Sequence, residues 1–266
     1  METPRLTAER IKKYLEQGKR FDGRNLEQFR EISIEYNVSN KAEGSARVKL
    51  GKTEVVVGVK MDVAEPYPDS PNKGNLMVTA ELLPLSSPRF ESGPPKFPAI
   101  EVGRLVDRAI RESKFIDFEK LCIEEGEKVW AVFIDIYSIN DDGNLIDAAC
   151  MGAVAALKNA KLPVYDEKEG KVSYGEFSDK KIPLTKELPI CVTAHRIGGK
   201  IIVDPTLEEE DVSETKVTIG GTPEGVISSI QKGNSTELTI EEVHEILDLT
   251  EKVRKKVFSS IKEYLD

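Results

Sequence analysis

Apolar and polar residues alternate along much of the first half of the chain, a pattern typical of strands with one buried face. Residues 32–38 and 46–50 alternate, and residues 53–63 form a long run rich in β-branched side chains. Gly51-Lys52 makes a tight turn between the second and third segments, and three such strands in this order predict an antiparallel meander. Residues 76–82, 121–123 and 129–137 predict further strands.

Three other segments have helical spacing or composition in the first 160 residues. Residues 7–17 and 101–112 each carry an apolar stripe on one side. Residues 145–160 are rich in alanine and apolar on most sides, and this predicts a buried helix that ends before Pro163.

The second half repeats this arrangement of strands followed by a helix. Hairpins are expected at 164–177 and at 190–204, further strands at 212–219 and 226–232, and a helix through 264 that begins at the capping box Thr239–Glu242. The sequence therefore predicts the α+β class with two similarly built subdomains. We expect an N-terminal helix at 1–18, a first subdomain at 19–162 and a second at 163–266.

Composition excludes several classes of protein. Of the 266 residues, 39% are hydrophobic and 32% are charged, with a net charge of −9, which favours a folded domain over a disordered chain. The longest apolar runs are shorter than the ~20 residues that cross a bilayer, and the first four residues have no apolar signal region. We therefore expect a cytoplasmic protein that does not bind membranes. Abundant Glu and Lys with little Gln, Cys or Met is typical of thermophilic proteins.

The histidines and cysteines predict neither a metal site nor a cofactor site. The three cysteines, Cys122, Cys150 and Cys191, are far apart and are expected to be reduced thiols. The two histidines, His195 and His244, have no metal ligands near them in the sequence. The sequence therefore predicts no metal and no cofactor, and it gives little support to an unrelated small-molecule enzyme.

The helix at 101–112 carries the most suggestive charge pattern. Arg104, Arg108 and Arg111 are spaced i, i+4 and i+7, so they lie on one side. A loop broken by Pro and Gly, residues 84–98, leads into this helix. The side could be a solvated face, with Asp107 and Glu112 neutralising part of the charge, or a surface along which phosphates lie.

Two stretches of sequence resemble the signatures of the RNase PH family. The first is Arg20-Phe-Asp-Gly-Arg24 together with residues 42–57, and the second is the arginine helix at 101–108. The resemblance runs from about residue 19 to the C-terminus and implies the RNase PH fold. Family members degrade RNA from its 3′ end with inorganic phosphate, and in the archaeal exosome a catalytic and a non-catalytic subunit of this family alternate in a six-membered ring.

The family's phosphate-binding turn is altered in this chain. A Gly-Thr-Arg turn at a helix N-terminus would bind the phosphate dianion through backbone N–H groups and a guanidinium. This chain keeps Asp142-Gly143 and the following helix, but it has Asn144, Leu145 and Ile146 at the turn. Asp147 comes next, and we expect its charge to repel a phosphate.

The family's acidic residues are altered as well. Active relatives have three acids spaced six residues apart, which hold a metal or act as general acid. The matching positions here are Asp204, Glu210 and Lys216, and lysine cannot replace a carboxylate. The neighbouring acidic run at 208–211 is expected to be a solvated loop.

The resemblance therefore points to the non-catalytic type of exosome subunit. It implies that Arg104 and Arg108 contact single-stranded RNA, with Arg111 ranked lower. It also implies a catalytic RNase PH-like partner in a ring of three heterodimers, with RNA-binding cap subunits on the ring. The alternative is a phosphate-dependent 3′–5′ exoribonuclease that is active by itself.

Overall fold

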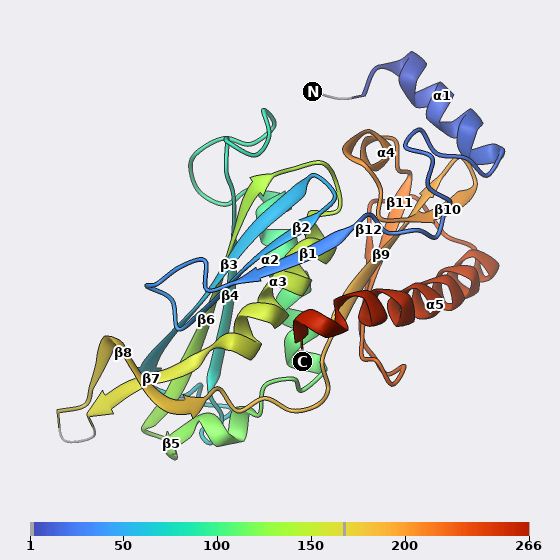
Figure 1. The fold of residues 1–266 in the computed structure, drawn as a ribbon. Helices are drawn as coiled ribbons and strands as arrows, with labels where there is room; N and C mark the ends of the chain where they lie inside the picture. Colours follow the sequence, from blue (N-terminus) through green and yellow to red (C-terminus); the bar gives the residue numbers. More distant parts are fainter. Residues whose placement is uncertain (1–2, 167–168, 266) are drawn as a thin grey trace.

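Two large β-sheets with helices packed on them form the main body of the part of the chain that the computed structural model describes, residues 3–166 and 169–265 (Figure 1). The first sheet contains β1 (Ile32–Tyr36), β2 (Gly44–Leu50), β3 (Thr53–Ala64), β4 (Asn75–Leu82), β5 (Cys122–Glu124) and β6 (Lys128–Asn140). Its order is β1-β2-β3-β6-β4, with β5 paired to β6. The predicted meander of β1, β2 and β3 is confirmed.

The long strand β6 lies between β3 and β4, an arrangement that local sequence patterns did not predict. It is antiparallel to β3 and parallel to β4. As a result, β4 is an edge strand of the sheet. Alternate residues of β3, from Val55 to Met61, are almost completely buried, because one face of the sheet packs against helices.

Two helices cover that face, α2 (Phe97–Glu112) and α3 (Leu145–Asn159). A short 3₁₀ helix, η1 (Phe118–Leu121), follows α2. The α3 helix is buried along most of its length, as predicted, because it lies between β2 and β3 on one side and β9 on the other. Gly152 permits this close packing, since a Cβ atom there would lie 2.7 Å from Cγ2 of Val57.

The second sheet contains β9 (Ile190–Ile197), β10 (Lys200–Val203), β11 (Thr215–Gly221) and β12 (Ile227–Gly233), in the order β10-β9-β11-β12. One of its faces contacts α2 and α3, since Lys216 pairs with Glu101 of α2 and Thr193 donates to Asp147 of α3. The other face packs against α5 (Ile240–Leu265), where Arg254 meets Gly221. The predicted capping box between Thr239 and Glu242 is confirmed.

Two further elements flank the sheets. The helix α1 (Arg5–Glu16) packs through Ile11 and Leu15 onto β9 and β10. The hairpin of β7 (Lys161–Asp166) and β8 (Lys171–Lys181) lies beside the first sheet, where Tyr165 contacts Trp130 edge to face. The α+β class is confirmed, whereas the boundary between subdomains at residues 162 and 163 stays a prediction. No helix in residues 3–166 or 169–265 is long and apolar enough to span a membrane.

The acidic run at 208–211 was wrongly predicted to be a solvated loop. Residues Leu207–Asp211 form a short helix, α4, with a capping box between Thr206 and Glu209. Glu209 is buried because it forms an ion pair with the buried Arg20, whose Nε lies 2.9 Å from the Glu209 Oε1 atom. An ion-pair partner 189 positions away thus determined which of these acids enters the interior.

Candidate functional site

The turn that would bind phosphate in active relatives connects β6 to the N-terminus of α3. Gly143 and Asn144 both have positive φ, at +85° and +61°. A Cβ atom on Gly143 would lie 2.6–2.7 Å from backbone atoms of residues 205–207, so only glycine fits this turn. The Thr53 hydroxyl donates to the Gly143 carbonyl at 2.6 Å and holds the turn against β3.

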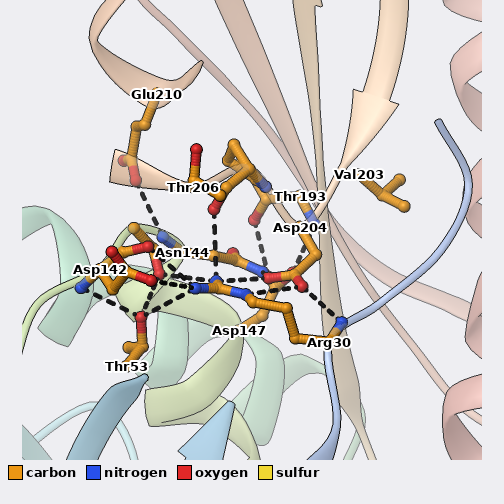
Figure 2. A network of polar contacts seen from close by, with 12 residues as sticks. Arg30, Thr53, Asp142, Asn144, Asp147, Thr193, Val203, Asp204, Thr206 and Glu210 are labelled. Carbon is orange, nitrogen blue, oxygen red and sulfur yellow. Dashed lines mark hydrogen bonds and ion pairs between the residues drawn. The ribbon is translucent and has the colours of Figure 1, made fainter. Parts of the chain in front are cut away.

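The anion-binding position at this helix end is occupied by the protein itself. The backbone N–H of Asn144 donates to Oε2 of Glu210 at 2.9 Å (Figure 2). The side chain of Asn144, the N-cap residue, forms no capping hydrogen bond with α3. The Glu210 carboxylate therefore provides the negative charge that a helix N-terminus favours, at one of the backbone N–H groups that an incoming phosphate would use.

Asp147 does not play the part that we expected from the sequence. Its side chain is fully buried and accepts hydrogen bonds from the Thr193 backbone N–H at 3.0 Å and from the Thr193 hydroxyl at 2.7 Å. Burial raises the pKa of Asp147 to about 7. The third residue of α3 points into the protein interior, so the acid at the phosphate position is Glu210 and not Asp147.

Asp204 is held in a buried network and is not open to a metal or a substrate. Its carboxylate accepts from the backbone N–H, Nε and Nη2 of Arg30 and from Nδ2 of Asn144 (Figure 2). It also accepts from Nη1 of Arg24, and all five distances are 2.7–2.9 Å. Burial alone would raise the pKa of Asp204, but the hydrogen bonds and charges of Arg30 and Arg24 lower it. Asp204 therefore fastens the segment before β1 to the α3 turn.

The three positions of the predicted degenerate acid site do not gather at one point. Asp204 lies in the network described above, Glu210 caps α3, and Lys216 pairs with Glu101 of α2, where its Nζ lies 2.8 Å from Oε2. In the part of the chain that the structure describes, no three His, Cys, Asp or Glu side chains are placed to hold a metal ion.

Glu210 and Lys216 line a cavity of about 520 Å³ beneath the loop at 84–98. Leu145 and Ile146 of the altered turn also line it. Its cations are each paired with an acid: Lys216 with Glu101, Arg89 with Asp211, and Lys96 with Glu91.

The same cavity is also lined by an acid that forms no ion pair with the described residues. This acid is Asp141, and burial, with the charge of Glu210 adding to it, raises the pKa of Asp141 to about 6. Since the lining cations are neutralised and negative charge is left over, the cavity does not suit a phosphate dianion.

Arg104 and Arg108 lie in a different place, a groove of about 630 Å³ between α2 and the edge strand β4. Both side chains are exposed, and neither forms a hydrogen bond or ion pair with residues 3–166 or 169–265. Arg111 differs from them, because it pairs with Asp107 at 2.7 Å and donates to the Leu76 carbonyl at 3.1 Å. The structure thus places the two unpaired arginines beside the cavity and not in it.

Sequence reasoning missed Arg30, which makes most of the contacts around Asp204. It also did not show that Arg20 and Arg24 of the first motif are used internally, Arg20 by Glu209 and Arg24 by Asp204. These arginines lie in an irregular segment without helical or strand periodicity. The only signal was their number among few apolar residues.

Comparisons with known proteins all match the same family of proteins. The model of the 3′ exoribonuclease family matches residues 28–163 with its first domain and residues 187–253 with its second. The chain is 52% identical to the exosome complex component Rrp42 of Methanocella arvoryzae, covering 88% of this chain and 86% of the relative. It is 44% identical to that of Methanothermobacter thermautotrophicus, covering 99% and 95%.

Solved structures give the same result. An Archaeoglobus fulgidus exosome structure with RNA bound to the active site contains a chain with a TM-score of 0.88 and 43% identity, covering 96% of this chain and 98% of that one. A chain of an archaeal exosome core has a TM-score of 0.84 and 40% identity, covering 98% and 97%.

Proposed function

The chain belongs to the RNase PH family of 3′ exoribonucleases, and from that premise we propose that it is a non-catalytic, RNA-binding component of an archaeal exosome. In this complex it would help to degrade RNA from the 3′ end without performing the chemistry itself. The fold, the family and the identity of the relatives agree with the prediction from sequence.

One observation carries the non-catalytic part of this proposal: the Glu210 carboxylate bound to the α3 N-terminus. Phosphorolysis requires a phosphate dianion held next to the scissile bond. Here a carboxylate takes the corresponding backbone N–H, and the third acid position is Lys216, already paired with Glu101. On this proposal the chain therefore has neither a free phosphate-binding site nor the three carboxylates of active relatives.

Arg104 and Arg108 support the RNA-binding part. A guanidinium without an internal partner is free to pair with a backbone phosphate, and such contacts carry no base information. RNA bound in the groove between α2 and the edge strand β4 would lie against a neighbouring subunit of the proposed ring. Arg111 is ranked lower because Asp107 already neutralises it.

The proposed partner supplies what this chain lacks. A catalytic RNase PH-like subunit would contribute the phosphate site, with three such heterodimers forming a hexameric ring. RNA-binding cap subunits would sit on the ring, and the complex would work in the cytoplasm. The solved relatives in exosome structures support this arrangement.

The test is charge reversal in the groove, Arg104→Glu with Arg108→Glu, in the complex with the catalytic subunit. We expect the ring to assemble, poly(A) decay to slow, and the slope of log K against log salt to fall in magnitude by about 1.4, since each contact to a single strand contributes about 0.7. The matched control is Lys256→Glu with Lys262→Glu, which reverses two exposed charges on α5. Equal effects of the two double variants would remove the groove from the RNA path.

A second assay tests the alternative of an independently active enzyme. The full chain alone is incubated with labelled poly(A) and inorganic phosphate, and the products are separated by chromatography. We expect no nucleoside diphosphates from this chain and their release from the complex. Phosphate-dependent release by the chain alone would contradict the non-catalytic assignment.

A further inference from the structure

The segment that contains α1 and the following turn is strongly basic within an acidic protein. Residues 3–24 hold seven Lys and Arg but three Asp and Glu, a net charge of +4, whereas the whole chain carries −9. This segment lies at the end of the molecule that also contains α4 and β10, while β4 belongs to the first sheet (Figure 1). It is therefore separate from the groove that contains Arg104.

Internal ion pairs use four of these seven cations. Arg5 pairs with Glu9, Lys12 with Glu214, Arg20 with Glu209 and Arg24 with Asp204. Arg10, Lys13 and Lys19 remain exposed and form no ion pair with the described residues. In a chain with an excess of acids, three neighbouring cations without an acidic partner indicate a surface that is available to an external anion.

One of the three unpaired cations, Arg10, lies over a pair of aromatic rings, and Lys13 and Lys19 are close to the same two aromatic residues in the sequence. Tyr14 and Phe21 meet edge to face with centroids 5.0 Å apart, and the Arg10 guanidinium lies 5.6 Å and 5.8 Å from the two centroids. The backbone N–H of Lys19 donates to the Tyr14 carbonyl at 3.0 Å, which holds the backbone of this turn against the end of α1. Phe21 is 46% exposed, so part of an aromatic face remains open to solvent.

We propose that this basic–aromatic surface, formed by Arg10, Lys13, Tyr14, Lys19 and Phe21, binds single-stranded RNA. Bases stack on the exposed aromatic ring while the cations pair with successive phosphates, the combination used by proteins that hold single strands without sequence preference. An acidic protein partner would use the three cations but would not require the exposed aromatic face. The surface is independent of Arg104 and Arg108, and it gives the chain a second contact with the RNA.

The experiment measures binding of fluorescent (A)30 to the full chain by anisotropy at several KCl concentrations. One variant removes the charges, Arg10→Ser with Lys13→Ser and Lys19→Ser. A second, Phe21→Leu, keeps the side-chain size but removes the aromatic face. The matched control is Lys186→Ser with Lys256→Ser and Lys262→Ser, three exposed lysines elsewhere.

We expect the charge variant to reduce the magnitude of the salt slope by about 2, since three phosphate contacts are lost. Phe21→Leu should weaken binding roughly tenfold at one salt concentration, because a stacked base is lost. Both effects should persist when Arg104→Glu and Arg108→Glu are also present, so this proposal and that for the groove fail separately. Thermal melts check that each variant folds.

Two results would overturn the proposal. In the first, the charge variant and its matched control reduce RNA binding equally, so that only the total charge matters. In the second, both surface variants bind RNA like the wild type but no longer bind a cap or ring subunit, which would make this a protein-docking surface.

Discussion

Replacing Glu210 by Gln tests whether this carboxylate stabilises the α3 N-terminus. The change keeps a side-chain oxygen that can accept from the Asn144 N–H, now at 2.9 Å, but removes the charge. A negative charge at a helix N-terminus contributes about 0.3–1 kcal/mol, and up to ~2 kcal/mol when partly buried. Glu210 is partly buried, so we expect a loss of about 1 kcal/mol for Glu210→Gln and about 2 kcal/mol for Glu210→Ala, which also removes the acceptor.

Urea denaturation at pH 7 measures both losses, with Glu208→Gln as control, because Glu208 is exposed on the same short helix and has no partner among the described residues. The wild type should show no added stabilisation by phosphate over chloride at matched ionic strength, since the anion position is occupied. Phosphate-specific stabilisation of the wild type, or equal stability of all the Glu210 variants and the control, would refute the reasoning.

Two further predictions concern the buried charges. Arg20→Met should lower the free energy of unfolding by about 3–5 kcal/mol, because it leaves the buried Glu209 carboxylate unpaired, and adding Glu209→Leu should recover much of this loss in the same urea titration. Burial raises the pKa of Asp147 to about 7 from 3.8, so the native state holds the proton more tightly than the unfolded state. Its contribution to stability is complete below pH 4 and disappears as the pH rises through 7. The free energy of unfolding of Asp147→Asn should therefore rise relative to that of the wild type by up to about 4 kcal/mol between pH 4 and pH 8. Urea unfolding at each pH measures this difference, and a difference that stays constant with pH would contradict the assignment.

The elements that local patterns determine were predicted well from the sequence. The run rich in β-branched residues at 53–63 identified β3, and the uncharged, alanine-rich stretch identified α3 as buried. The position of β6 between β3 and β4 was not predictable, because that pairing joins residues far apart in the chain. The same limit explains why the burial of Glu209 was not predicted. A glutamate in an acidic run is expected to be exposed, but its distant partner Arg20 holds it in the interior.

For the candidate site, the sequence identified the altered positions but not what those residues do. The spacing singled out Glu210 and Lys216, and both line one cavity. Sequence could not show that Glu210 fills the anion position, because the contact between α4 and the α3 turn spans 66 residues. It misassigned that part to Asp147, whose position three residues into the helix directs it toward Thr193.

Arg104 of the groove stays unpaired because the acids three residues before and after it have other partners. Glu101 precedes Arg104 by three residues, a spacing at which helix side chains pair, but Lys216 holds it at 2.8 Å. Asp107 follows Arg104 by three residues, and Arg111 holds it at 2.7 Å. Lysine at position 216 therefore has two effects: it removes a carboxylate from the position of the third acid, and it draws Glu101 away from Arg104. The change that argues against chemistry in this chain thus also keeps a guanidinium free, which supports its proposed use as a contact to RNA.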